Sequence, residues 1–399
     1  FDYLQDYELV VGNLQGDLAV FKGQQCHPWA EKHNLGMIMV VVIGDVLNEG
    51  KNSTVCISGE GLCHIFGMKS DSPLDNEKQS LQLFHTQRLP ANTKVALLAD
   101  VDNDGEVELV LGLTDHVLRT YRWVRINQNP NDFTGKLVGL HKLELADQIS
   151  SISLNPSTEG SPYILIAQSG GTYIHFQCCD EQAGEFSDGS SGSKLTTPVH
   201  HPLASSRMRN PNISSEILGG IRGTRNGETK DSLIAVATLD GTLMLVDGDD
   251  ILWSFQVDHQ LFTITKLDLL GDGEEEVIAC AWDGQTYMVN QQRQSVRFQF
   301  DEPVSAFNSG KYSITPGTCT PALVYATFGD RVHLYYDVCL PSFKINNFLT
   351  AMEQHPESSD LLSRFPVDVK DSKQLRNLYT KCLYNFPSHL LKSESEEKP

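Results

Sequence analysis

The stretch EVIACAWDGQTYMV, residues 276–289, contains two short apolar runs joined by a turn at Gly284. Such runs, separated by Asp-Gly, are typical of a β-hairpin. The pattern occurs in six more places: ELVVGNLQGDLAVF (8–21), TVCISGEGLCHIF (54–66), ELVLGLTDHVLRTY (108–121), YILIAQSGGTYIHF (163–176), SLIAVATLDGTLMLV (232–246) and ALVYATFGDRVHLY (322–335). The seven turn residues follow at intervals of 45, 55, 55, 70, 43 and 46: Gly16, Gly61, His116, Gly171, Gly241, Gly284 and Asp330. Periods in this range indicate propeller blades or solenoid coils.

Further apolar runs flank the hairpins and complete each repeat. Examples are MIMVVVIGD (37–45), LFTITKLDLL (261–270), PVSAFNSG (303–310) and SVRFQF (295–300). Four strands in each of seven repeats predict an all-β fold, a seven-bladed β-propeller over residues 1–340. The alternative is a pair of β-sandwiches, which would need no such internal register.

Three segments depart from the repeat. Residues 180–211 are rich in Gly, Ser and Pro, which predicts a disordered insertion, and residues 67–88 read as a shorter polar loop. The apolar spacing in 372–386 predicts an amphipathic helix, and 343–353 reads as another. We therefore expect a helical C-terminal extension over 341–392 and a disordered tail over 393–399.

The ends of the propeller are expected to be incomplete. Aligning Glu8 with Glu108 places Asp2 at the third position of a loop, so blade one would lack its inner strand. After residue 338 the chain turns to Pro341 and a helical pattern instead of a fourth strand. We expect residues upstream of Phe1 to supply both missing strands.

Composition limits the classes of partner. The 399 residues include 51 acidic and 31 basic ones, a formal net charge of −20. This charge would repel nucleic acid or an anionic lipid surface unless a basic patch intervened, and the sequence has none. No apolar run reaches the roughly 18 to 20 residues that cross a bilayer. Nine cysteines without a CxxC pair favour a reducing compartment over a disulfide framework or a zinc site. We expect protein partners, no nucleic acid and no direct membrane insertion.

A candidate metal loop lies in ADVDNDGEVELVLG (99–112), with carboxylates at Asp100, Asp102, Asp104 and Glu108. An EF-hand is excluded because its twelfth position would be Leu111 and the flanking runs read as strands. Two interpretations stay open: a hard cation that joins two strands, or an Asx-rich turn that holds no ion.

Two other repeats carry decayed copies of this loop. The sixth repeat has Leu270 at the third position of the loop, although Asp268, Asp272, Gly273 and Glu276 are kept. The second has Leu47 there and Ser53 at the ninth position, although Asp45, Glu49 and Gly50 are kept. Loops that lack ligands should hold ions poorly.

No catalytic motif is present. The sequence has no GxSxG, HExxH, P-loop or GxGxxG after a strand, and its 13 histidines do not cluster with carboxylates at metal spacing. His200 and His201 lie in the predicted insertion, where an adjacent pair is typically exposed to solvent. We expect no enzyme. Sequons at Asn52 and Asn212 keep open an extracellular ligand-binding propeller, against which the unpaired cysteines count.

A strand-loop-strand unit with a DxDxDGxxE loop and a following hairpin resembles the FG-GAP repeats of integrin α-subunit propellers. LPANTKVALLADVDNDG (89–105) and VDHQLFTITKLDLLGDGEEEVIACAWDGQTYMV (257–289) are similar to segments of the family of integrin α FG-GAP repeat-containing proteins. The resemblance spans nearly the whole chain. It places one structural calcium ion, if any, on Asp100, Asp102, Asp104, the backbone carbonyl of Glu106, and Glu108.

The resemblance also implies a function. It implies a scaffold subunit of the KICSTOR complex, held peripherally through partners at the cytoplasmic face of the lysosomal membrane. Its expected partners are kaptin and the other KICSTOR subunits, and through the assembly the GATOR complex. The expected role is to help restrain mTOR signalling when amino acids are scarce. The alternative remains an integrin-like extracellular propeller that calcium stabilises.

Overall fold

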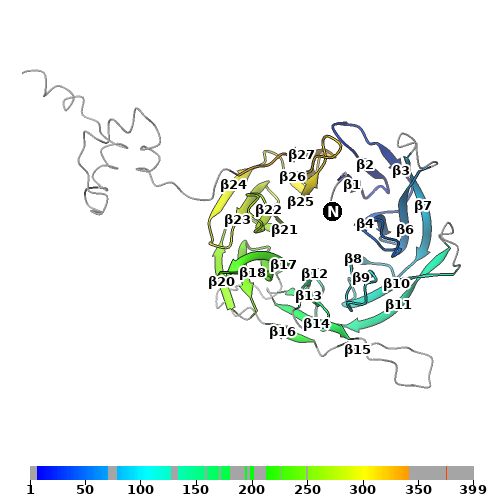
Figure 1. Ribbon diagram of the computed structural model, residues 1–399, viewed down its shortest axis with the longest axis horizontal. Coiled ribbons are helices and arrows are strands. Elements are labelled where there is room, and N and C mark those ends of the chain that lie inside the picture. The colour runs from blue at the N-terminus through cyan, green and yellow to red at the C-terminus, as the bar shows by residue number, and fades with distance from the viewer. Residues whose placement is uncertain are drawn as a thin grey trace, which may run out of the picture. The chain divides into compact units, whose positions relative to one another are not determined.

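The computed structural model describes residues 7–70, 79–126, 134–157, 160–169, 172–179, 194–195, 198–201, 213–225, 227–248, 250–340 and 374. Within these residues the chain forms seven antiparallel sheets, arranged as the blades of a ring (Figure 1). The prediction of an all-β, seven-bladed propeller is confirmed. The chain divides into two compact units, Phe1–Phe343, which contains the propeller, and Lys344–Pro399.

Five blades have at least four strands each. Blade two consists of β4 (Ile38–Gly44), β5 (Ser53–Ser58), β6 (Leu62–Ser70) and β7 (Gln79–Arg88); blade three of β8 (Thr93–Ala99), β9 (Glu108–Leu113), β10 (Val117–Arg125) and β11 (Gly135–Glu144); blade four of β12 (Ser151–Asn155), β13 (Tyr163–Ala167), β14 (Tyr173–Cys179), β15 (Lys194–Leu195) and β16 (Val199–His201); blade five of β17 (Ser215–Arg225), β18 (Glu228–Thr238), β19 (Thr242–Asp247) and β20 (Asp250–Gln256); and blade six of β21 (Leu261–Leu267), β22 (Glu276–Ala281), β23 (Gln285–Val289) and β24 (Ser295–Gln299).

The first and last blades have three strands each in the part of the chain that the structure describes. Blade one consists of β1 (Leu9–Gly12), β2 (Leu18–Phe21) and β3 (Ala30–Lys32), and blade seven of β25 (Val304–Tyr312), β26 (Thr320–Thr327) and β27 (Val332–Tyr336). Three hydrogen bonds join the segments of these neighbouring blades. The Tyr7 N–H donates to Ser313 Oγ over 2.9 Å, the Ser313 N–H donates to the Tyr7 carbonyl over 3.2 Å, and the Tyr312 hydroxyl donates to the Gly23 carbonyl over 2.8 Å.

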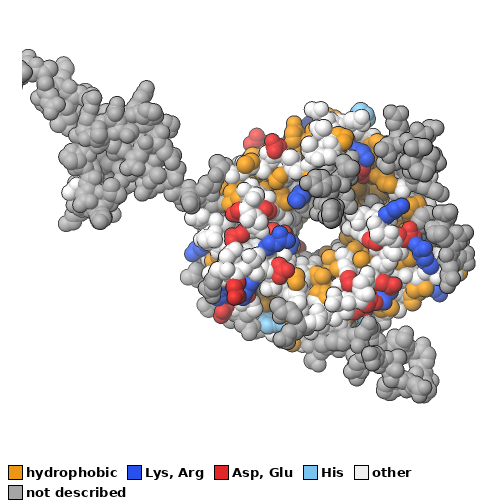
Figure 2. All heavy atoms as spheres, viewed as in Figure 1, with side chains coloured by type: hydrophobic (Ala, Val, Ile, Leu, Met, Phe, Trp, Pro, Cys, Tyr) orange, Lys and Arg blue, Asp and Glu red, His pale blue; other side chains and the backbone are white. Residues whose placement is uncertain are grey.

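Each blade runs from the centre of the ring to its rim. The first strands of neighbouring blades contact one another in the order β4, β8, β12, β17, β21 and β25, and Figure 1 shows them around the centre. Figure 2 shows an opening there, with acidic and basic side chains scattered over the visible face. The second strands are the most buried, because both of their faces are covered by neighbouring blades. β5, β9 and β22, for example, are buried at every residue.

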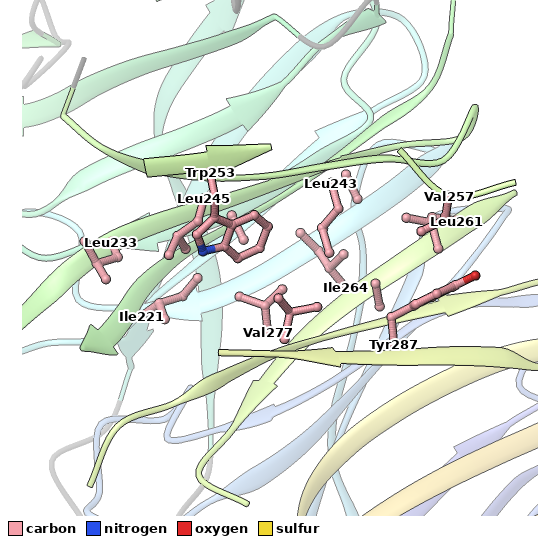
Figure 3. Packing of buried hydrophobic residues seen from close by; sticks show 14 of the residues in the cluster. Ile221, Leu233, Leu243, Leu245, Trp253, Val257, Leu261, Ile264, Val277 and Tyr287 are labelled. Atoms are coloured by element: carbon pink, nitrogen blue, oxygen red, sulfur yellow. The ribbon is translucent and has the colours of Figure 1, made fainter. Parts of the chain in front are cut away.

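The hydrophobic core lies between adjacent blades. Figure 3 shows the cluster between blades five and six, where Trp253 and Leu245 of blade five face Val277 of blade six. Apolar side chains alternate along these strands, and the buried ones interdigitate between two sheets. Burying apolar surface stabilises the ring by about 25 cal/mol per Å².

The turn between the second and third strands has the same form in every blade. Five residues separate the last paired residues, and the central three form the turn. The third of these three has a left-handed conformation wherever it is described, with φ between 57° and 92°. Gly284 shows why glycine is preferred: a Cβ there would lie 2.3 Å from the Phe300 carbonyl oxygen. The carbonyl of this third residue accepts an N–H bond from the residue that follows the fourth strand, such as Phe300 at 3.1 Å.

One loop prediction is wrong, and a second is wrong at residues 194–195 and 199–201. Residues 67–88 extend β6 and β7 as a paired hairpin up to Ser70 and from Gln79 onward. Within 180–211, predicted as disordered, β15 and β16 both pair with β14. His200 is exposed as expected, but His201 is half-buried, stacks on Tyr173 and lies 3.0 Å from His175. The composition of these segments is polar, yet pairing with an existing strand satisfies their backbone.

The remaining predictions concern the termini and the cysteines. The helices expected over 341–392 and the tail over 393–399 lie outside the described residues, apart from Gln374, which is helical. Seven cysteines of the described residues are free thiols: Cys26, Cys56, Cys63, Cys178, Cys280, Cys319 and Cys339. In the same part of the chain, no helix is long and apolar enough to span a membrane.

Candidate metal loop

The candidate metal loop joins the first and second strands of blade three. Asp100 directly follows β8, and Glu108 is the first residue of β9. Strands therefore flank the loop on both sides, as predicted, and the helices of an EF-hand are excluded.

Hydrogen bonds to its own backbone shape the loop. Asp100 Oδ2 accepts the Gly105 N–H over 2.9 Å, and Asp104 Oδ1 accepts the Glu106 N–H over 2.8 Å. These are Asx-type bonds, which form without an ion. Gly105 has a φ of 90°, a backbone conformation that is strained in residues with a side chain.

Glu108 links the end of the loop to its beginning by a hydrogen bond. Its Oε2 accepts the Val101 N–H over 3.0 Å, and both residues are completely buried. The carboxylates of Asp100 and Asp102 join it, with one oxygen from each of the three lying within 4.8 Å of the others. That is also the largest separation of two oxygens that each lie about 2.4 Å from one calcium ion. The sequence correctly predicts that these three carboxylates converge.

Arg122 of β10 fills the space among the carboxylates. It pairs with Glu108 across the β9–β10 ladder, so its side chain projects over the loop. Its Nε donates to Glu108 Oε1 over 2.6 Å, and its Nη2 donates to Asp102 Oδ2 over 2.8 Å. Nη1 lies 2.7 Å from Asp104 Oδ2, and Nε lies 3.5 Å from Glu106 Oε2. One guanidinium thus contacts four of the five residues predicted to hold the ion.

Electrostatics keep Arg122 charged, although the pKa of Glu108 stays raised to about 7. Burial alone would lower the pKa of the Arg122 guanidinium, but its bond to Glu108 and the nearby carboxylates raise that pKa above its ordinary value. Burial raises the pKa of Glu108, and the Val101 N–H and Arg122 counter that rise. Arg122 is therefore protonated at every physiological pH and offsets part of the repulsion among the carboxylates.

A resident calcium ion does not fit this arrangement. Calcium needs six to eight oxygen ligands, and Arg122 already occupies the carboxylate oxygens of Asp102, Asp104 and Glu108 that face the centre. Calcium and the guanidinium would also repel each other at this distance. Leaving Asp102 aside, the loop has one buried carboxylate oxygen without a hydrogen bond, Asp100 Oδ1.

Sequence reasoning missed Arg122. It lies 14 residues beyond Glu108 and outside the loop motif, in a strand that was predicted only as part of a hairpin. The strand register could have revealed it. With a three-residue turn at 114–116, antiparallel pairing places residue 122 opposite residue 108. A cation at that position opposite an acidic loop could have been noticed.

The loop of blade six forms the same backbone bonds with no arginine. Gly273 donates to Asp268 over 3.0 Å, and Leu269 donates to Glu276 over 2.8 Å. Val277 pairs with Val289, so the next residue, Asn290, lies next to Glu276. Arg122 has the corresponding position opposite Glu108 in blade three. The shared geometry indicates that the turn chemistry alone gives these loops their shape. Burial raises the pKa of Glu276 to about 7, and the charges of Asp272 and Asp268 add to the rise.

The loops also join neighbouring blades. Asn48, in the blade two loop, accepts the N–H of Val107 over 2.7 Å, and Glu49 forms an ion pair with Arg125 of β10. In blade six the Glu275 N–H donates to the carbonyl of Arg222 in blade five over 2.8 Å. The decayed copies therefore hold blades together whether or not they bind ions.

One polar groove, between blades five and six, has a volume of about 340 Å³. Its lining includes His259 and Ser295, and His259 Nδ1 lies 2.5 Å from Asp283. Ser295 and His259 share no hydrogen bond, so this groove, within the residues described, lacks an activated serine nucleophile.

Seven antiparallel blades, three of which have a carboxylate loop between their first and second strands, define a β-propeller of the FG-GAP type. Residues 22–340 match the family model described as Integrin-alpha FG-GAP repeat-containing protein 2, and the chain belongs to that family.

Two relatives extend the match beyond the propeller. A mouse protein, KICSTOR complex protein ITFG2, is 40% identical over 393 residues, which cover 95% of this chain and 89% of the mouse protein. A Bos taurus protein of the same name is 37% identical over 373 residues, which cover 88% of this chain and 69% of that protein.

Solved structures share the fold at low identity. BBS1N in complex with ARL6DN has a TM-score of 0.56 at 12% identity, over 84% of this chain and 89% of that chain. Saccharomyces cerevisiae Sqt1 has a TM-score of 0.53 at 15% identity, over 84% and 81% of the two chains. These likenesses concern the fold alone.

Proposed function

We propose that this chain is a non-catalytic scaffold subunit of a KICSTOR complex. The observation that carries the proposal is the 40% identity, over 95% of the chain, to a mouse protein with that name. The match extends along nearly the whole chain.

The architecture suits a scaffold. A propeller presents turns on both faces and outer strands at its rim, so several proteins can bind one rigid ring at the same time. The cluster of carboxylates in blade three serves the fold through Arg122 and backbone N–H groups, and it leaves no open coordination site for catalysis.

The finer role is part of the same proposal. The expected partners are kaptin and the other KICSTOR subunits, which would hold the chain at the cytoplasmic face of the lysosomal membrane. Through the assembly it would help recruit the GATOR complex and restrain mTOR signalling during amino-acid starvation. No resident calcium ion is required, because Arg122 supplies positive charge inside the loop.

Co-purification tests membership of the complex. The tagged full chain, co-expressed with kaptin and the other KICSTOR subunits, should elute with them as one species in gel filtration. If the folded chain elutes alone at micromolar concentration, the proposal is wrong.

A cellular assay tests the role. Cells that lack the protein should keep mTOR signalling high during amino-acid starvation, and the wild-type chain should restore the response. Gly284→Val should fail because its Cβ would lie 2.3 Å from the Phe300 carbonyl oxygen, whereas Gly310→Ala, with no atom within 4 Å of the new Cβ, should succeed. Normal signalling in cells without the protein, or calcium-dependent binding of a ligand at the cell surface, would contradict the scaffold assignment.

A further inference from the structure

The three-residue turns between second and third strands provide seven equivalent positions on one face of the ring. Their registers match in all blades, so the first residue of each turn can be compared directly. In chain order these residues are Leu14, Gly59, Thr114, Ser169, Leu239, Trp282 and Phe328.

The apolar members are consecutive around the ring. Blades five, six, seven and one carry Leu239, Trp282, Phe328 and Leu14, and Figure 1 shows these four blades side by side. We call these four residues the apolar arc. Blades two, three and four carry Gly, Thr and Ser instead. The first turn residues are thus divided into an apolar run and a small or polar run.

The fold does not require these apolar side chains. The first turn residue uses its backbone N–H, which Thr114 donates to Asn92 over 3.0 Å and Leu239 donates to Ser214 over 3.0 Å. Blade three makes this bond with a threonine and blade two makes the same turn with Gly59. The apolar residues therefore need another explanation.

Solvent reaches most of the apolar arc. Leu14 is 64% exposed, Phe328 66% and Trp282 38%, whereas Leu239 is half-buried. Trp282 stacks on Phe262 with ring centroids 4.1 Å apart, and Phe328 lies 6.1 Å from Trp282. The aromatic groups of blades six and seven thus form one continuous surface. Contiguous exposed apolar surface on a folded protein typically marks a binding site.

Carboxylates accompany every residue of the apolar arc. Asp17, Asp240, Asp283 and Asp330 follow the four residues within three positions. Asp17 and Asp283 contact imidazoles, His33 at 2.8 Å and His259 at 2.5 Å. No lysine or arginine is ion-paired with these four aspartates in the described structure. The arc is therefore apolar with an acidic border.

We propose that the apolar arc docks a partner protein through a segment in which lysine or arginine side chains flank exposed aliphatic or aromatic ones. Such a segment matches the arc in both respects: its apolar groups cover Phe328 and Leu14, and its cations face the aspartates and stack on the Trp282 indole. The partner is another subunit of the complex proposed above, so this inference rests on the proposed function.

The test measures assembly with kaptin and the other KICSTOR subunits by pull-down titration of the full chain. The double variant Leu14→Ser, Phe328→Ser should bind at least about 30-fold more weakly, because exposed aromatic and aliphatic anchors dominate such interfaces. Ile126→Ser and Ile251→Ser, which remove apolar groups that are 63% and 45% exposed and lie away from these turns, should bind as the wild type does. Each variant should retain the wild-type melting temperature.

A charge variant tests the partner's chemistry. Asp283→Lys should weaken binding several-fold and reduce its dependence on salt. Asp115→Lys changes the same turn position in blade three, outside the arc, and should have no effect.

Four results would overturn the inference. One is undiminished binding by the double variant under conditions in which the wild type binds. Absence of wild-type binding would instead contradict the proposed function itself. A second is equal weakening by Asp115→Lys and Asp283→Lys. A third is a wild-type homodimer in light scattering that the double variant abolishes, which would make a second copy the occupant. A fourth is binding to vesicles of phosphatidylserine that the double variant abolishes.

Discussion

Replacing Arg122 with methionine should convert the loop of blade three from an ion-independent to a calcium-responsive one. Methionine keeps much of the length of the side chain but removes the positive charge. The carboxylates of Glu108 and Asp102, 0% and 4% exposed, then lose their cation, while Val101 still donates to Glu108. The loop would be left with several carboxylates around an empty centre.

The cost without calcium follows from burial. Removing one partner of a buried ion pair costs about 3 to 5 kcal/mol, because the other charge stays buried and uncompensated. At roughly 2 °C per kcal/mol for a domain of this size, the melting temperature should fall by about 6 to 10 °C at pH 8. The loss should be smaller at pH 6, because burial raises the pKa of Glu108 and the carboxyl then takes up a proton.

Calcium should recover part of this loss only in the variant. Exposed carboxylate loops bind calcium with dissociation constants of roughly 0.1 to 1 mM, so about 10 mM calcium should add about 1.4 to 2.7 kcal/mol. The wild type should melt at the same temperature in calcium and in EGTA.

Thermal unfolding followed by circular dichroism, with and without calcium, measures both effects. Arg125→Met is the matched control: Arg125 lies on the same strand, and its 33% exposed side chain pairs with Glu49, so its loss should cost less than about 1 kcal/mol and give no calcium response. A wild type that calcium stabilises by several degrees would refute the reasoning, as would an Arg122→Met variant as stable as the wild type in EGTA.

Three further predictions concern other blades. Glu276→Gln should stabilise the protein at pH 8 by about 1 to 3 kcal/mol, because the pKa of Glu276 is raised to about 7. The contribution of Glu276 to folding stability is therefore full below its ordinary pKa of 4.5 and is lost as pH rises through 7. Denaturation at a series of pH values from about 4 to 8 measures this difference. Gly284→Val should cost about 3 kcal/mol or more in urea denaturation, because φ is 89° and the Phe300 carbonyl blocks the side chain; an unchanged midpoint would contradict this. Tyr312→Phe should cost about 1 kcal/mol and speed hydrogen exchange in blade one, but not in blade four, because it removes the bond to Gly23; uniform exchange would show that this bond does not close the ring.

Local pattern and turn chemistry predict most of this fold. The seven hairpins stand where their turn residues indicated, because a left-handed residue such as Gly241 or Gly284 is needed wherever two apolar runs reverse direction. The pattern fails where strands are stabilised by pairing alone. β15 and β16 contain only Lys194–Leu195 and Val199–His201, and nothing in these residues indicates a strand until β14 is present beside them.

The candidate site was predicted in part for a related reason. The carboxylates of Asp100, Asp102 and Glu108 converge as the loop spacing indicates, because they are close in the chain. Arg122 reaches them only through the register of the next hairpin, and a motif search within the loop cannot include it. A local motif thus predicts the arrangement of its ligands, whereas the cation in the centre depends on the neighbouring strand.

The arginine gives the loop a property that suits the proposed location. A loop of this kind, with a dissociation constant for calcium of roughly 0.1 mM or weaker, would stay empty wherever calcium is scarce, and its carboxylates would repel one another. A guanidinium that is part of the chain is present at every calcium concentration and, with its pKa held above the ordinary value by Glu108, Asp102 and Asp104, at every pH at which the fold exists. The blade then keeps its shape without an ion. A propeller that uses this substitution has no need of an extracellular calcium supply, which favours the intracellular scaffold over the calcium-stabilised receptor.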